Sequence, residues 1–260
     1  MDREGIVLIG RMLRPSRSAQ ILLSCLIVAF PLFKLLSAMR FGVGVGLWPP
    51  VEAALTLISS LILGVALSGD LGGLSDKIRA LLLWAFGWSI ASFLIWSAIN
   101  PFIDLMTLPS MAKFHLFLLI LSLTSGSLGL LIGSLFGEPV YGFGMALIIA
   151  AVFMSSVFWA NLFLGGTSGH SQLLIDFAID SNPVILASAL LGGDPMHTKY
   201  LYGISEVSFY RFRYPKIHVI AVEYIASFLI LCSLAAVRQR TFKDFHLRSS
   251  FILLHLFPFR

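Results

Sequence analysis

The sequence predicts an all-α integral membrane protein with about six transmembrane helices. Of its 260 residues, 58% are hydrophobic and only 12% are charged, whereas about 25% are charged in an average soluble domain. The mean hydropathy is +0.92, and the apolar residues gather in runs near the length of about 20 that one crossing helix needs. A soluble protein could not cover this much apolar surface, which excludes soluble enzymes and nucleic-acid-binding proteins.

The first 19 residues are basic and intermittently apolar. Ile6, Ile9 and Leu13 share one face of a helix, which predicts a cytoplasmic amphipathic helix lying on the membrane surface. A solvated basic tail that only sets the orientation of the chain explains the same residues equally well.

Six apolar runs follow this segment and are each long enough to span a membrane. Together they form a transmembrane domain over residues 20–237, and residues 238–260 form a basic, partly apolar cytoplasmic tail. The predicted spans are 20–38, 51–69, 80–100, 113–136, 141–164 and 217–237.

The distribution of lysine and arginine predicts the orientation of these spans. With both termini in the cytoplasm, eleven of these residues lie inside, six lie outside, and Lys34 lies near the outer end of the first span. Both termini are basic, as an even number of spans requires. This orientation puts the long connection over residues 165–216 outside the cytoplasm.

Two short apolar segments in this connection are the most informative part of the sequence. Leu173–Ile179 and Val184–Leu191 are separated by a break at Asp180-Ser-Asn-Pro183. Each is too short to cross a hydrocarbon core of about 30 Å. They predict a re-entrant helical hairpin between the fifth and sixth spans, hinged at Asn182 and Pro183.

Small residues recur every four positions in the fourth span. Such a stripe lets a neighbouring backbone approach closely, as membrane helices require. Either packing within the chain or a seam between two copies explains it. The stripe consists of Ser125, Gly129, Gly133 and Gly137.

A few polar side chains lie in or near the predicted spans. Glu223 is the most costly to place in a membrane, so it is expected to face a translocation path or to hold a neighbouring span. Asn161 has the same two interpretations, whereas Glu52, His115 and His218 are expected at the headgroups. Neither cysteine indicates a disulfide or a metal site, and no catalytic residue is predicted.

This layout resembles the membrane subunit of type-2 ABC exporters. The resemblance implies a permease subunit that works as a homodimer or heterodimer in the bacterial inner membrane, among lipids, with no nucleic-acid partner. It also implies that Asn182 and Pro183 belong to an outer gate. The loop that would contact the ATPase subunit contains Asp70, Leu74, Ser75, Asp76, Lys77 and Arg79.

The chain has no Gly-x-x-x-x-Gly-Lys-Ser/Thr motif, so it is not expected to be an enzyme, and it needs no cofactor of its own. ATP and Mg²⁺ are expected on the partner subunit. The spans contain no repeated acidic residues for proton coupling. A cavity lined by Phe, Trp and small residues would suit an apolar or amphipathic cargo.

Two other functions remain open from the sequence. A non-catalytic membrane subunit or an assembly factor would have the same composition. An intramembrane serine protease is suggested by Gly166-Thr-Ser-Gly169, with Ser168 as the nucleophile and His218 as its base. The polar residues that follow Ser168 are unlike a buried catalytic helix.

Overall fold

The computed structural model describes residues 48–69, 73–103, 106–136, 138–164, 171–196 and 214–256. Within these ranges the protein is all-helical. Four helices are long and apolar enough to cross a membrane, and the number rises to five if a bent pair of short helices counts as one span. The all-helical prediction is therefore confirmed for these residues, and their long apolar helices are compatible with a membrane protein. The predicted first span and the segment 1–19 lie outside the described residues.

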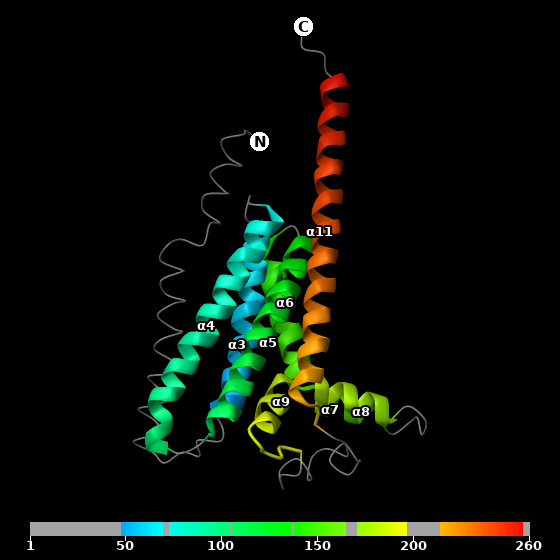
Figure 1. Ribbon diagram of the computed structural model, residues 1–260. Coiled ribbons are helices and arrows are strands. Elements are labelled where there is room, and N and C mark those ends of the chain that lie inside the picture. The colour runs from blue at the N-terminus through cyan, green and yellow to red at the C-terminus, as the bar shows by residue number, and fades with distance from the viewer. Residues whose placement is uncertain are drawn as a thin grey trace.

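The five longest helices of the described residues run along one common direction (Figure 1). They are α3 (Trp48–Ser68), α4 (Leu74–Ile103), α5 (Leu108–Leu135), α6 (Pro139–Met154) and α11 (Ile217–Leu256). The shorter helices are α7 (Ser156–Leu164), α8 (Ser171–Asp180) and α9 (Pro183–Leu190). Helices α8 and α9 lie at one end of the bundle, and α11 projects beyond the other end.

Helix α5 is the centre of the fold, with α3, α4, α6, α9 and α11 all in contact with it. Its closest partner is α3, and glycines make this approach possible. The α carbons of Gly64 and Gly129 face each other, so that a side chain at either position would collide with backbone atoms of the other helix. One turn further on, Gly133 lies against the Ser68 side chain and the Val65 carbonyl. The small residues therefore join two helices of one chain.

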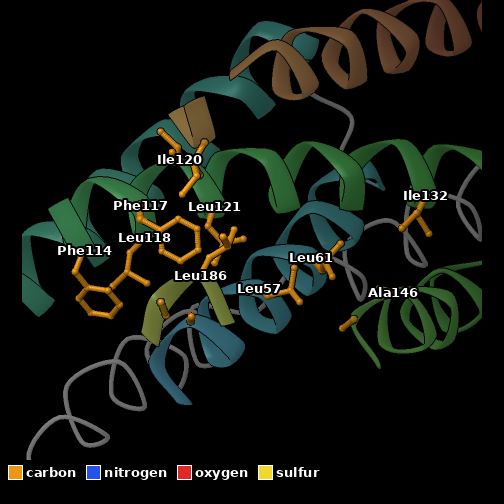
Figure 2. Close-up of a cluster of buried hydrophobic side chains, with 14 of the residues drawn as sticks. Leu57, Leu61, Phe114, Phe117, Leu118, Ile120, Leu121, Ile132, Ala146 and Leu186 are labelled. Atoms are coloured by element: carbon orange, nitrogen blue, oxygen red, sulfur yellow. The ribbon is translucent and has the colours of Figure 1, made fainter. Parts of the chain in front are cut away.

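A cluster of buried apolar side chains lies between α3, α5, α6 and α9 (Figure 2). Leu57 and Leu61 of α3 pack with Phe117 and Leu121 of α5, and Leu186 of α9 joins them at the same end of the bundle. This arrangement seats the short helix α9 directly on the two central helices.

Two predicted elements differ from the structure. The fifth span is not one helix, because it breaks at Ser155 between α6 and α7. At Ser155 the backbone leaves the helical conformation, with φ −100° and ψ 13°, and the Ser155 hydroxyl donates to the Ala151 carbonyl at 2.6 Å. The segment expected as a loop before residue 80 is helical from Leu74 onward, because the amides of Asp76 and Lys77 bond to the Gly73 carbonyl.

Replacing Gly129 by alanine is expected to lower the free energy of unfolding by about 1–3 kcal/mol, because the new methyl group overpacks a backbone contact. The measurement is the thermal unfolding of the purified protein in detergent. Gly144→Ala on α6 is the matched control, since nothing lies within 4 Å of that position. Equal melting temperatures for the two variants would contradict this account of the α3–α5 contact.

Candidate functional site

The most polar part of the described bundle is a buried cluster shared by α3, α4 and α5. Its titratable members are Glu52, only 1% exposed, and His115, 5% exposed. Ser92, also buried, lies between them. Glu52 is four residues from the start of α3, so it lies about 6 Å along that helix. A carboxyl group at this position would be very costly without hydrogen bonds.

Hydrogen bonds surround both carboxylate oxygens of Glu52. The Ser92 hydroxyl donates to Oε1, and the Trp96 indole N–H donates to Oε2 at 2.8 Å. On the other side of Ser92, its Oγ lies 3.1 Å from Nε2 of His115. The second ring nitrogen, Nδ1, is 2.7 Å from the Met111 carbonyl oxygen. A carbonyl oxygen only accepts, so Nδ1 carries a hydrogen and the ring is held in one orientation.

A second polar contact lies one turn further along α3. The Trp88 indole N–H donates to Thr56 Oγ1 at 2.9 Å, and this hydroxyl donates to the Glu52 carbonyl at 2.8 Å. Ser60 and Ser122 are hydrogen-bonded at 2.7 Å one turn beyond that. The polar face of α3 is therefore continuous from Glu52 to the glycine contact.

Apolar side chains close this cluster at the end of the bundle. Trp96, Met106 and Met111 form a small buried core, against which Phe93 and Leu191 pack. Phe93 and Phe114 also contact the His115 ring edge-on. The cluster is shielded from bulk water by these groups, which strengthens every electrostatic interaction within it.

Glu52 and His115, which were expected to reach the headgroups, are instead buried among protein side chains. A sequence signal for Glu52 exists: the four-residue spacing of Ser60, Gly64 and Ser68 extends back to Thr56 and Glu52. Residues at this spacing lie on one face of a helix, and that face is the one turned toward α5 and α4. No comparable repeat marks Ser92 or His115.

A separate group of polar contacts joins the break between α6 and α7 to the break between α8 and α9. Asn182 begins α9, where its Oδ1 accepts from the Val184 and Ile185 amides at 3.0 and 3.1 Å. Its Nδ2 donates to the Met154 carbonyl at 3.0 Å and to Ser156 Oγ at 3.1 Å. The predicted gate residue Asn182 is thus a structural link between α6–α7 and α8–α9, and Pro183 is buried beside it.

The hydrogen bonds at these breaks satisfy backbone carbonyls that helical pairing leaves open. Ser156 donates to the Ala178 carbonyl at 2.5 Å, and the Trp159 indole donates to the Val152 carbonyl at 2.8 Å. Each unsatisfied carbonyl would cost several kcal/mol in an apolar medium. The breaks in the two helix pairs therefore stabilise each other.

At the opposite end of the bundle, the residues expected to contact an ATPase subunit divide into two groups. Ser75, Asp76 and Arg79 are exposed in the first turns of α4, with Leu74 half-buried. Lys77 is only 5% exposed, and its ammonium donates to the Ser68 carbonyl at 2.8 Å. A positive charge there neutralises the carbonyl end of α3. Asp70 lies outside the described residues.

The remaining predicted site residues lie apart from the buried cluster. Glu223 is exposed on α11, next to Tyr224, whose carbonyl accepts a hydrogen bond from Thr124 of α5. Ser125 is buried and bonds to the Leu121 carbonyl of its own helix. Asn161 lies in α7 with its side chain outside the described residues, and Gly137 is also outside them.

The connection that follows α9 is held to the start of α11. The Tyr214 hydroxyl donates to Asp194 Oδ1 at 2.6 Å and accepts from the Met196 amide at 3.2 Å. Burial, together with the bond to Asp194, raises the pKa of the Tyr214 phenol. The phenol therefore remains protonated and keeps this link intact over the whole physiological pH range.

The buried cluster differs from the arrangement of a serine hydrolase. A serine nucleophile needs a histidine base that is oriented by a third group. Here the carboxylate contacts Ser92 itself, and the histidine is oriented by a backbone carbonyl. The protease residue Ser168 lies outside the described ranges, and His218 is exposed at the start of α11. No group of three potential metal ligands occurs among the described residues.

Comparisons with known protein families, with curated proteins and with solved structures give no match.

Replacing Asn182 by aspartate is expected to destabilise the protein by about 1–3 kcal/mol, because an oxygen would then face the Met154 carbonyl. Aspartate keeps the side-chain oxygen that caps α9. The change therefore removes only the hydrogen bonds that the amide nitrogen donates. Thermal unfolding in detergent measures the loss. Ser181→Ala is the control, since that hydroxyl makes only a 3.5 Å contact. Equal stability of the two variants would show that the link between the breaks is unimportant.

Lys77→Met is expected to cost about 1–3 kcal/mol, because it leaves the Ser68 carbonyl without its charged donor. Arg79→Met removes an exposed charge whose contact with Asp76 spans 4.0 Å, and its effect should stay within about 0.5 kcal/mol. Urea unfolding of both variants in the same detergent distinguishes them. A larger loss for Arg79→Met would contradict the assigned role of Lys77.

Proposed function

We propose that this chain is the permease subunit of an ATP-driven transporter of the type-2 ABC exporter kind. In this proposal two such subunits form the translocation path, and a separate subunit binds ATP and Mg²⁺. The observation that carries the proposal is the bent pair of α8 and α9, which turns through 78° at one end of the bundle. The exposed first turns of α4 lie at the opposite end.

The bend favours a re-entrant hairpin over a broken span. Helices α8 and α9 have 10 and 8 residues, so each reaches only about 15 Å or less. The hairpin would enter the outer leaflet and return. Protein groups at Asn182 and Ser156 satisfy the backbone at the turn, as a membrane-buried break requires.

On this interpretation the chain has six spans. The first lies within residues 20–38, α3, α4 and α5 are the next three, α6 with α7 is the fifth, and α11 is the last. The basic residues then favour cytoplasmic termini and an inner-membrane location. The exposed apolar faces of these helices would contact lipid, a second permease subunit, or both.

Helix α4 is suited to transmit motion from a partner subunit into the membrane. Ser75, Asp76 and Arg79 offer a polar, exposed surface at its start, while Lys77 fastens that start to the end of α3. Further along, Ser92 and Trp96 connect α4 to Glu52. A force on the first turns of α4 would therefore reach α3 through Lys77. It would reach α3 and α5 through the contacts of Ser92.

The main alternative is a non-catalytic membrane subunit of a larger complex. The observation that favours it is the length of α11, whose 40 residues extend about 60 Å. Only Ile217–Gln239 of this helix has the composition of a span. The remainder is a further length of helix that a permease does not require. A stable partner other than an ATP-binding subunit would support this alternative.

The chain is expected to co-purify with an ATP-binding subunit when it is tagged and extracted from its native membrane in mild detergent. The double variant Asp76→Ala/Arg79→Ala should reduce the recovered ATPase activity at least tenfold while thermal stability stays unchanged. The control is Lys113→Ala. Lys113 is exposed near the start of α5, at the end of the bundle away from the first turns of α4. Absence of any ATPase subunit from the wild-type preparation would overturn the proposal.

A further inference from the structure

We propose that the predicted first span, residues 20–38, packs lengthwise against the outer face of α4. This outer face consists of five exposed residues: Leu83, Phe86, Gly87, Ile90 and Leu94. The docking does not depend on an ATPase partner or on the transporter function. It depends on residues 20–38 crossing the membrane as a helix, and it names the neighbour of that helix within the same chain.

The outer face of α4 lies opposite the side by which this helix joins the bundle. Trp88 and Ser92 are buried toward α3 and α5, to which they are hydrogen-bonded. Leu83 and Leu94, on the other side of the helix, are 77% and 61% exposed. Figure 1 shows α4 at one side of the central pair α3 and α5, with α11 at the other side. Among the described residues, the outer face of α4 is therefore uncovered.

The connection to α3 brings the first span to this side of the bundle. Only residues 39–47 separate the predicted span from Trp48, where α3 begins. Nine residues reach at most about 30 Å. The Trp48 side chain packs against the small core that contains Trp96, near the C-terminal end of α4. The chain therefore enters α3 next to α4, whereas the exposed face of α11 lies across the bundle.

The direction and length of the first span also match α4. Helix α3 ends at Ser68, whose carbonyl accepts from Lys77 in the first turns of α4. A span that leads into the start of α3 must therefore run parallel to α4, from its first turns toward its last. A helix over residues 20–38 would be about 28 Å long, whereas Leu83 and Leu94 are about 17 Å apart along α4. One span can therefore cover the whole outer face.

A glycine in the middle of the outer face favours a helix over lipid as the neighbour of α4. Glycine weakens a helix relative to alanine, and in membrane helices it lets another backbone come close. Gly64 and Gly129 serve this purpose between α3 and α5. At Gly87, nothing among the described residues lies within 4 Å of where a side chain would begin. Gly87 is therefore suited to a close contact with a helix outside the described ranges.

The test is disulfide cross-linking of the full-length protein in its native membranes, with copper phenanthroline as the oxidant. In a background that carries Cys232→Ser, single cysteines are placed at the four consecutive positions 24–27, which sample every side of a helix. Each is combined with Leu83→Cys or Ile90→Cys on α4. A disulfide requires α carbons within about 7 Å of each other. We expect at least one position to form a disulfide with α4 within a single chain, identified by mass spectrometry of the digested protein.

Two exposed positions on other long helices are the matched controls. They are Leu147→Cys on α6 and Leu234→Cys on α11, and neither should form a disulfide with positions 24–27. A product of twice the chain mass would show that a second copy covers α4. Disulfides to α6 or α11 would place the first span elsewhere, and no disulfide at all would leave the outer face to lipid. Each of these three results would overturn the proposal.

A matched pair of glycine variants measures the closeness of this contact without any cross-link. Gly87→Leu should lower the melting temperature of the full-length protein in detergent by several degrees, because the new side chain holds the first span away from α4. Gly144→Leu is the control, since Gly144 is exposed on α6 and also has nothing within 4 Å among the described residues. Equal melting temperatures would contradict a close contact at Gly87.

Discussion

The close approach of α3 and α5 is the contact on which the rest of this bundle depends. Gly64 and Gly129 let the two backbones touch, and the other helices then pack on the pair that results. In a membrane, apolar side chains gain nothing by leaving lipid for one another, so helices associate through tight packing and hydrogen bonds. Both are concentrated along α3, where small residues occupy one half of the face and hydrogen-bonding residues the other half.

A second constraint acts where helices break. A carbonyl that loses its helical partner inside an apolar medium must find another donor in the protein. Here the break between α6 and α7 and the break between α8 and α9 lie side by side, and Asn182 and Ser156 serve both. The bent pair is therefore not a loose insertion, because its turn is bonded to the bundle from within.

The helices that could be predicted from the sequence are those marked by long apolar runs. The runs that became α3, α4, α5 and α11 are long enough to identify without knowledge of their neighbours. The break at Ser155 was not predictable, because no proline marks it and because Asn182, which bonds to the Met154 carbonyl there, is distant in sequence. The position of Glu52 was missed for a related reason. Its partners Ser92 and Trp96 are distant in sequence, and only the packed bundle brings them to the carboxylate.

The unbroken course of α11 has a mechanical consequence. The 17 or so residues after Gln239 remain helical to Leu256, which extends the helix about 25 Å past the part that is long and apolar enough to cross a membrane. A rod amplifies rotation: a tilt of about 10° at the bilayer would sweep its tip sideways by about 4 Å over that length. A partner bound to the C-terminal end of α11 would therefore respond to, or cause, small changes in the tilt of this helix.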